Sequence, residues 1–89
     1  MLLIDDLLGK AVAMEASDVH INVGMPPVVR INTELITMDL PAINDEEAEN
    51  LVLSMLGKDR YAVLKQKRDI DFAITISNGA RFRVNAHYQ

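Results

Sequence analysis

The stretch DIDFAITISNGARFRVNAHYQ, residues 69–89, predicts a hairpin of two strands. Apolar side chains recur at every second position on both sides of its central turn signal: Ile70, Phe72, Ile74 and Ile76 before it, and Phe82, Val84, Ala86 and Tyr88 after it. This alternation is typical of half-buried strands, because successive side chains point to opposite faces of a sheet. Each strand should therefore have one apolar and one polar face.

The length of the loop decides which side chains of the hairpin face each other. A two-residue turn at Asn78-Gly79 would place Ile74 opposite Arg83 and mix isoleucines with arginines on one face. A three-residue loop, 77–79, with a left-handed Gly79 instead pairs Ile74 with Phe82. We therefore predict the three-residue loop. It also pairs Phe72 with Val84 and sets Thr75, Ala73 and Asp71 across from Arg81, Arg83 and Asn85.

The first third of the chain predicts a helix, a strand and a second hairpin. Residues 2–15 have apolar residues at helical spacing, and residues 17–23 alternate as a strand that ends before Pro26-Pro27. Residues 28–39 indicate a hairpin with a two-residue turn at Asn32-Thr33, which would pair Val29 with Ile36 and Arg30 with Leu35. Thr33 suits a type I′ turn poorly, because a β-branched residue resists a positive φ.

Two helices are predicted between the hairpins. Asn44 and Glu47 have the spacing of a capping box, an apolar stripe follows, and Gly57 is the stop signal. Asp59 would then cap a shorter basic helix that reaches about Arg68, with Tyr61 and Leu64 facing inward. The order of elements predicts an α+β domain in which helices cover one face of an antiparallel sheet.

The composition restricts the class of protein. The chain has 89 residues, 49% hydrophobic and 25% charged, which suits one globular domain. A net charge of −4 argues against a nucleic-acid binder, and the absence of cysteine excludes a disulfide framework. Apolar stretches of a few residues predict no insertion into a membrane, and we expect a cytoplasmic domain.

The polar sheet face is the candidate site. Its predicted members are Asp18, His20, Asn22, Arg30, Asp71, Arg81, Arg83, Asn85 and His87. One interpretation is a solvated surface on which aspartates pair with arginines; the other is that Arg30, Arg81 and Arg83 meet an anion, since guanidinium groups match phosphate and carboxylate. Asp18 and His20 have a spacing that could hold a metal, but two ligands rarely suffice, and no metal site is predicted. No nucleotide-binding loop is present in the sequence.

Three motifs resemble one family. ASDVHINVGMPPVVRIN (residues 16–32), DIDFAI (69–74) and ARFRVNAHYQ (80–89) are similar to the N-terminal domain of the type IV pilus retraction ATPases, the PilT-like members of the secretion ATPase superfamily. The resemblance implies a PAS-like α/β domain, here residues 1–89, that precedes a RecA-like motor domain absent from this chain. The chain would then be an excised domain or a stand-alone remnant.

The resemblance also implies partners and a cofactor. The two domains would form a cytoplasmic homo-hexameric ring at the base of a pilus or secretion machinery, a peripheral position at the inner membrane, with ATP and Mg²⁺ bound on the motor domain. By motif, Arg81, Arg83 and Arg30 would face this nucleotide, while Asp18, His20 and Asp71 have no assigned role. We expect no cofactor and no catalysis in the fragment alone.

The chain departs from the family pattern at two places. Thr33 stands where the family commonly has a glycine, and His87-Tyr88 replaces a stretch that in the family more often begins with Phe. Two other functions stay open: a PAS-type sensor that binds a ligand between sheet and helices, and an assembly module whose arginines only make salt bridges between subunits.

Overall fold

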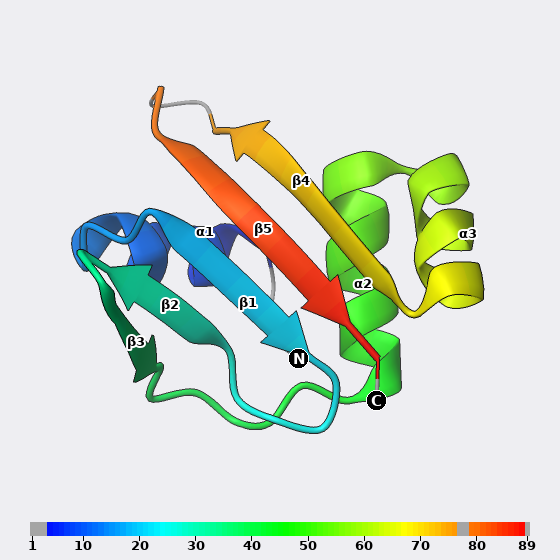
Figure 1. Ribbon diagram of the computed structural model, residues 1–89, viewed down its shortest axis with the longest axis horizontal. Helices are drawn as coiled ribbons and strands as arrows, with labels where there is room; N and C mark the ends of the chain where they lie inside the picture. Colours follow the sequence, from blue (N-terminus) through cyan, green and yellow to red (C-terminus); the bar gives the residue numbers. More distant parts are fainter. Residues whose placement is uncertain (1–3, 77–78, 89) are drawn as a thin grey trace.

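The computed structural model describes residues 4–76 and 79–88 as a five-stranded sheet with three helices (Figure 1). The elements in chain order are α1 (Ile4–Ala13), β1 (Asp18–Asn22), β2 (Val28–Ile31), β3 (Glu34–Thr37), α2 (Asp45–Leu56), α3 (Lys58–Lys67), β4 (Asp69–Thr75) and β5 (Arg81–His87). The strands lie in the order β3-β2-β1-β5-β4. The predicted α+β class is confirmed.

The C-terminal hairpin has the predicted register. Phe72 lies opposite Val84, and Thr75 lies opposite Arg81. At the end of the hairpin the Ile76 amide donates to the Ala80 carbonyl at 3.0 Å, and Gly79 has the predicted positive φ of 88°. Residues 77 and 78 of the predicted loop lie outside the described residues. Apart from Ala73, which lies opposite Arg83, the apolar side chains of β4 and β5 therefore share one face.

One strand pair differs from the prediction. The sheet is mixed rather than antiparallel, because β1 and β5 run parallel, with Val19 beside Val84. A parallel pair needs a crossover connection, and here all the elements from β2 to β4 lie between β1 and β5 in the chain. The crossover places β5 between β1 and β4, so that Val84 and Ala86 are almost fully buried.

The first hairpin is confirmed with its two-residue turn. Val29 pairs with Ile36 and Arg30 pairs with Leu35, as predicted. Asn32 takes a left-handed φ of 58°, whereas Thr33 does not have a positive φ. The turn thus places its strain on asparagine, a residue that tolerates this conformation well, and spares the β-branched one.

The helices agree with the prediction except at the start of α3. The capping box of α2 is present: the Glu47 amide donates to Asn44 Oδ1 at 2.8 Å, and the Asn44 amide donates to Glu47 Oε1 at 3.3 Å. The prediction that Asp59 caps α3 is wrong, because Gly57 both ends α2 and precedes α3, which leaves Asp59 inside the first turn. α1 ends at Ala13 rather than at the predicted residue 15, and residues 2 and 3 lie outside the described part.

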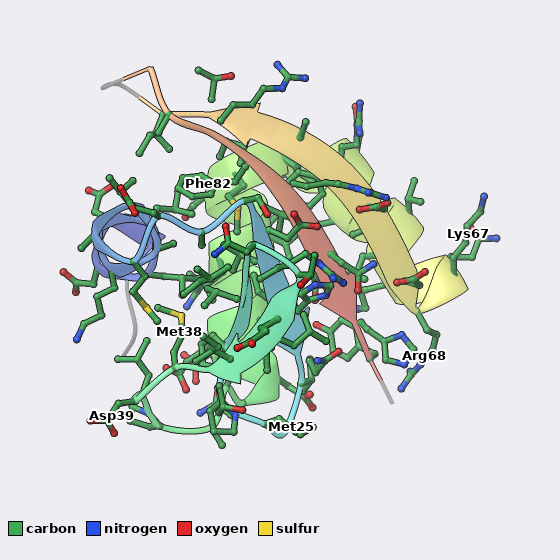
Figure 2. All side chains as sticks on the ribbon, turned by 60° about the vertical axis from the view of Figure 1, so that its left-hand side comes forward. Met25, Met38, Asp39, Lys67, Arg68 and Phe82 are labelled. Atoms are coloured by element: carbon green, nitrogen blue, oxygen red, sulfur yellow. The ribbon has the colours of Figure 1, made fainter. Side chains whose placement is uncertain are left out.

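The core lies between the sheet and the helices. α1 and α2 lie behind the sheet in Figure 1, and α3 lies beside α2 near the edge strand β4. Figure 2 shows Phe82 on the inner side of β5, and only 2% of this residue is exposed. The core side chains are those of Leu7, Leu8, Ala11, Val19, Ile21, Val29, Met38, Ile43, Ala48, Leu51, Val52, Leu64, Ile70, Phe72, Phe82, Val84 and Ala86. The opposite, polar face of the sheet is covered by no described element.

Candidate functional site on the polar sheet face

The polar sheet face contains a shallow hollow of about 150 Å³. Six side chains from four strands line it: Asp18, His20, Arg30, Asp71, Arg83 and Asn85. All six belong to the predicted polar face, so the structure brings together positions from three separate sequence motifs. Three predicted members of that face do not line the hollow: Asn22, Arg81 and His87.

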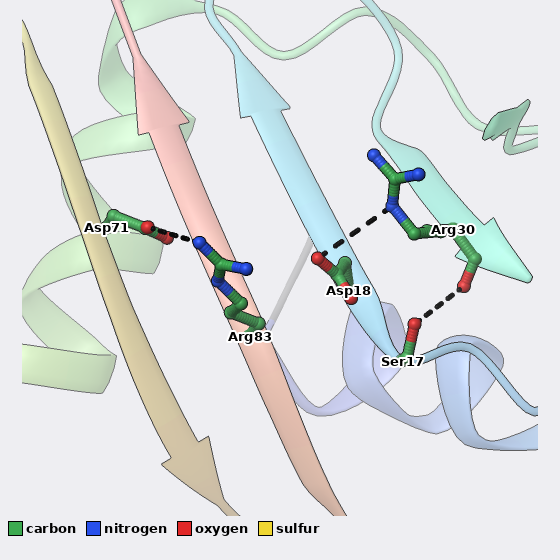
Figure 3. Close-up of polar contacts among 5 residues, drawn as sticks. All are labelled: Ser17, Asp18, Arg30, Asp71 and Arg83. Carbon is green, nitrogen blue, oxygen red and sulfur yellow. Dashed lines mark hydrogen bonds and ion pairs between the residues drawn. The ribbon is translucent and has the colours of Figure 1, made fainter. Parts of the chain in front are cut away.

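Asp18 lies between two arginines in one cross-strand row. Its Cα partners are Arg30 on β2 and Arg83 on β5. Arg30 Nε is 4.0 Å from Asp18 Oδ2, as Figure 3 shows. The neighbouring Ser17 holds the two flanking strands in place, since its amide donates to the Arg30 carbonyl and its carbonyl accepts from the Arg83 amide, both at 3.0 Å. The spacing of the two arginines is therefore set by the backbone.

Arg83 has the shortest ion pair of this face. One of its terminal nitrogens donates to Asp71 Oδ2 at 3.0 Å across the β4–β5 pair (Figure 3). This hydrogen bond, the charge of Asp71 and, more weakly, the charge of Asp18 raise the pKa of the Arg83 guanidinium. The Arg83 side chain is 68% exposed and that of Asp71 48%, so water and salt screen the pair strongly.

Arg81 stands apart from the other two arginines. It lies opposite Thr75, two residues before Arg83 on the same face of β5. It is exposed, and no ion pair joins it to any residue in the described part of the chain. The three predicted arginines therefore do not form one cluster: Arg30 and Arg83 flank Asp18 on neighbouring strands, whereas Arg81 lies apart from them and makes no ion pair with a described residue.

His20 has a ring nitrogen without a partner. Its Nε2 atom is buried and makes no hydrogen bond, although the ring borders the hollow. Its Cα partners are Asn85 on β5 and Val28 on β2. Within residues 4–76 and 79–88 no group of three or more His, Cys, Asp or Glu side chains could hold a metal ion.

Two polar residues of this face were not predicted to be paired. Asn85 Nδ2 donates to Asp69 Oδ1 at 3.1 Å, and His87 Nδ1 lies 3.9 Å from the same oxygen. The signal was present in the sequence, because Asp69 shares the parity of Asp71 in β4. The register places it opposite His87.

A second hollow, of about 410 Å³, lies between α2 and α3 and is bordered by Tyr88, which follows β5. Lys65 Nζ lies 5.9 Å from the centre of the Tyr61 ring, and the Arg68 guanidinium lies 5.5 Å from that of Tyr88, beside the end of β5 (Figure 2). Burial, the hydrogen bond with Tyr61 and nearby acidic groups raise the pKa of Tyr88 to about 12. The remaining lining residues are Asp45, Glu46 and Glu49. Sequence reasoning gave this group no role.

Comparison with known proteins supports the family resemblance. No family model matches the chain. The chain is 28% identical over 86 residues to the type IV pilus retraction ATPase PilT of Pseudomonas aeruginosa, which covers 97% of the chain. A crystal structure of the pilus retraction motor PilT with bound ADP matches the whole chain at 28% identity, with a TM-score of 0.71. The resemblance to the N-terminal domain of PilT-like secretion ATPases is confirmed.

Two further relatives point the same way. A twitching motility protein of Neisseria gonorrhoeae is 33% identical over 60 residues, or 67% of this chain. The structure of the Legionella pneumophila ATPase DotB matches 90% of the chain at 26% identity, with a TM-score of 0.68. The chain spans 25% of the length of the PilT relative and 16% of that of the twitching motility protein. None of the helices in the described part has the length and apolar character needed to span a bilayer.

Proposed function

We propose that this chain is the N-terminal domain of a hexameric pilus-retraction or secretion motor ATPase. In this proposal the domain packs between subunits and presents Arg81, Arg83 and Arg30 to ATP bound with Mg²⁺ on a RecA-like motor domain. One observation carries it: an uncovered, arginine-bearing sheet face in a domain similar over its whole length to a pilus motor structure that contains ADP. The ring would work in the cytoplasm, against the base of the pilus or secretion machinery.

The proposed chemistry is electrostatic. Phosphoryl transfer leaves charge on the transferred group, and a positioned arginine stabilises that charge without taking part in bond making. The sequence holds no Walker A loop, so these 89 residues would supply arginines and not the phosphate cradle. Arg81 and Arg83 are both exposed on this face and are therefore accessible to a bound phosphate.

The first test is to read the gene beyond codon 89 for a Walker A motif. In the protein that includes a motor domain, we expect Arg81→Ala and Arg83→Ala each to lower ATP turnover about tenfold or more. An arginine that contacts the transferring phosphate can raise kcat by ~10³-fold or more. The matched control is Arg60→Ala, an exposed arginine on α3, away from the polar face. Unchanged turnover in both β5 variants would contradict the nucleotide role.

Two alternatives give different outcomes. If the domain is only an assembly module, the same variants should reduce the fraction of protein assembled into rings, while the turnover per assembled ring stays unchanged. A PAS-type sensor would need space between sheet and helices. Among the described residues, the inward-facing Val19, Ile21 and Val84 are 0% exposed, which argues against such a space beside them.

A further inference from the structure

We propose that Asp71 competes with phosphate for Arg83, so that a phosphate meets Arg81 first and then draws Arg83 away from Asp71. This inference rests on the proposed function, because it concerns the same face and names the carboxylate that regulates it. Asp71 would be a positioning residue, acting through Arg83 rather than on the phosphate itself.

The geometry of the two arginines suggests this order. Arg81 has no ion pair with a described residue, whereas Arg83 donates to Asp71 at 3.0 Å. Both arginines lie on the same face of β5, two residues apart. An anion that binds Arg81 therefore lies within a long side chain's reach of Arg83, whose side chain would turn away from Asp71 to exchange partners.

The exchange is energetically accessible. The Arg83–Asp71 pair is exposed on both sides, and exposed pairs contribute little free energy. A phosphate carries more charge than one carboxylate and accepts two parallel hydrogen bonds from a guanidinium. Arg30 is a poorer candidate, since it is less exposed than Arg83 and lies beside Asp18, whose carboxylate is four-fifths covered.

The test uses the 89-residue chain and tripolyphosphate as the probe, titrated by calorimetry and by NMR of the Arg83 Nε–H group at one low ionic strength. We expect Asp71→Asn to tighten tripolyphosphate binding about two- to fivefold. The factor is modest because binding then no longer has to break an exposed Arg83–Asp71 ion pair, and such pairs contribute little free energy. The matched control is Asp69→Asn. It removes the same charge from the same face of β4, but from a carboxylate that contacts Asn85 and His87 instead of an arginine.

A double-mutant cycle separates competition from long-range charge. In an Arg83→Gln background, the gain from Asp71→Asn should fall to that seen for Asp69→Asn, and the Arg83 signal of the parent chain should move on binding. Equal gains for the two aspartate variants, or no tripolyphosphate binding in any variant, would overturn the inference. The outcome is distinguishable from failure of the proposed function, which would appear as unchanged ATP turnover in the Arg81→Ala and Arg83→Ala motor variants even if Asp71→Asn tightened binding.

Discussion

The two faces of the sheet are made by alternate residues of the same strands, yet they differ in almost every physical property. Along β5, Phe82 and Val84 are 2% and 0% exposed, whereas the intervening Arg83 is exposed. The apolar face is closed by α1 and α2, whereas no described element covers the polar face, where Arg30 and Arg83 pair with aspartates and Arg81 makes no ion pair with a described residue. Neighbouring residues of one strand therefore serve different purposes: one side chain stabilises the core, and the next is available for recognition. A substitution on the apolar face should change stability, and a substitution at the adjacent residue should leave stability almost unchanged.

The largest effect is expected from removing an apolar-face side chain. Phe82→Ala should lower the free energy of unfolding by about 3–5 kcal/mol, because it removes buried surface and leaves a cavity. The neighbouring Arg83→Ala should cost at most about 1 kcal/mol, the range of an exposed ion pair. Urea denaturation of the two variants, followed by circular dichroism, measures both values. A similar loss in both would mean that the polar face supports the fold and is not reserved for a partner.

The helical layer that covers the apolar face can be tested at the tight corner between α2 and α3. Gly57, between α2 and α3, has φ 84° and ψ −178°, a conformation that is essentially restricted to glycine. Gly57→Ala should therefore destabilise the chain by about 1–3 kcal/mol.

Gly9 is the matched control for Gly57. It lies within α1, its φ is not positive, and a Cβ there would meet no atom within 4 Å. Gly9→Ala should stabilise the chain by about 0.5–1 kcal/mol, because alanine favours the helix. Thermal melts of both variants test the pair. A neutral Gly57→Ala would show that the corner relaxes and that the cover over the apolar face does not depend on it.

The parts of the fold that the sequence predicted are those governed by local periodicity. Alternation gave the register of both hairpins, since a shift of one residue at Ile74 would have exposed the whole apolar face of β4. The capping box at Asn44 was equally readable, because its two partners are three residues apart. In each case the interacting residues are close in sequence.

Long-range features were not predictable in the same way. The parallel pairing of β1 with β5 joins segments from the two ends of the chain, and no local pattern indicates it. The sequence predicted which residues share the polar face, but it did not predict which of them form ion pairs. That Arg83 is paired while Arg81 is not follows from the carboxylates that β4 places opposite β5. The tyrosine-lined hollow depends on how α2 and α3 pack, which periodicity does not determine.

The smallest effect on stability is expected at Tyr88, which directly follows β5 and packs against the edge of the core. Burial and acidic neighbours raise its pKa from 10.0 to about 12 in the folded chain, so the folded state holds the phenol proton more tightly than the unfolded state. Its contribution to stability is therefore complete below about pH 10 and is lost as the pH rises from about 10 to 12. Urea midpoints across this interval should fall more steeply for the parent chain than for Tyr88→Phe, which has no proton to lose.

Tyr61→Phe is the control for this titration. It removes the hydrogen bond to Tyr88 but leaves the burial that is the larger cause of the shift, so most of the pH dependence should remain. The phenolate absorbance of this variant, which retains Tyr88 as its one tyrosine, reports the pKa of Tyr88 directly. A pKa near 10 there would show that this end of β5 is as solvated as the polar face. The buried apolar face would then end at Ala86 and would not include Tyr88.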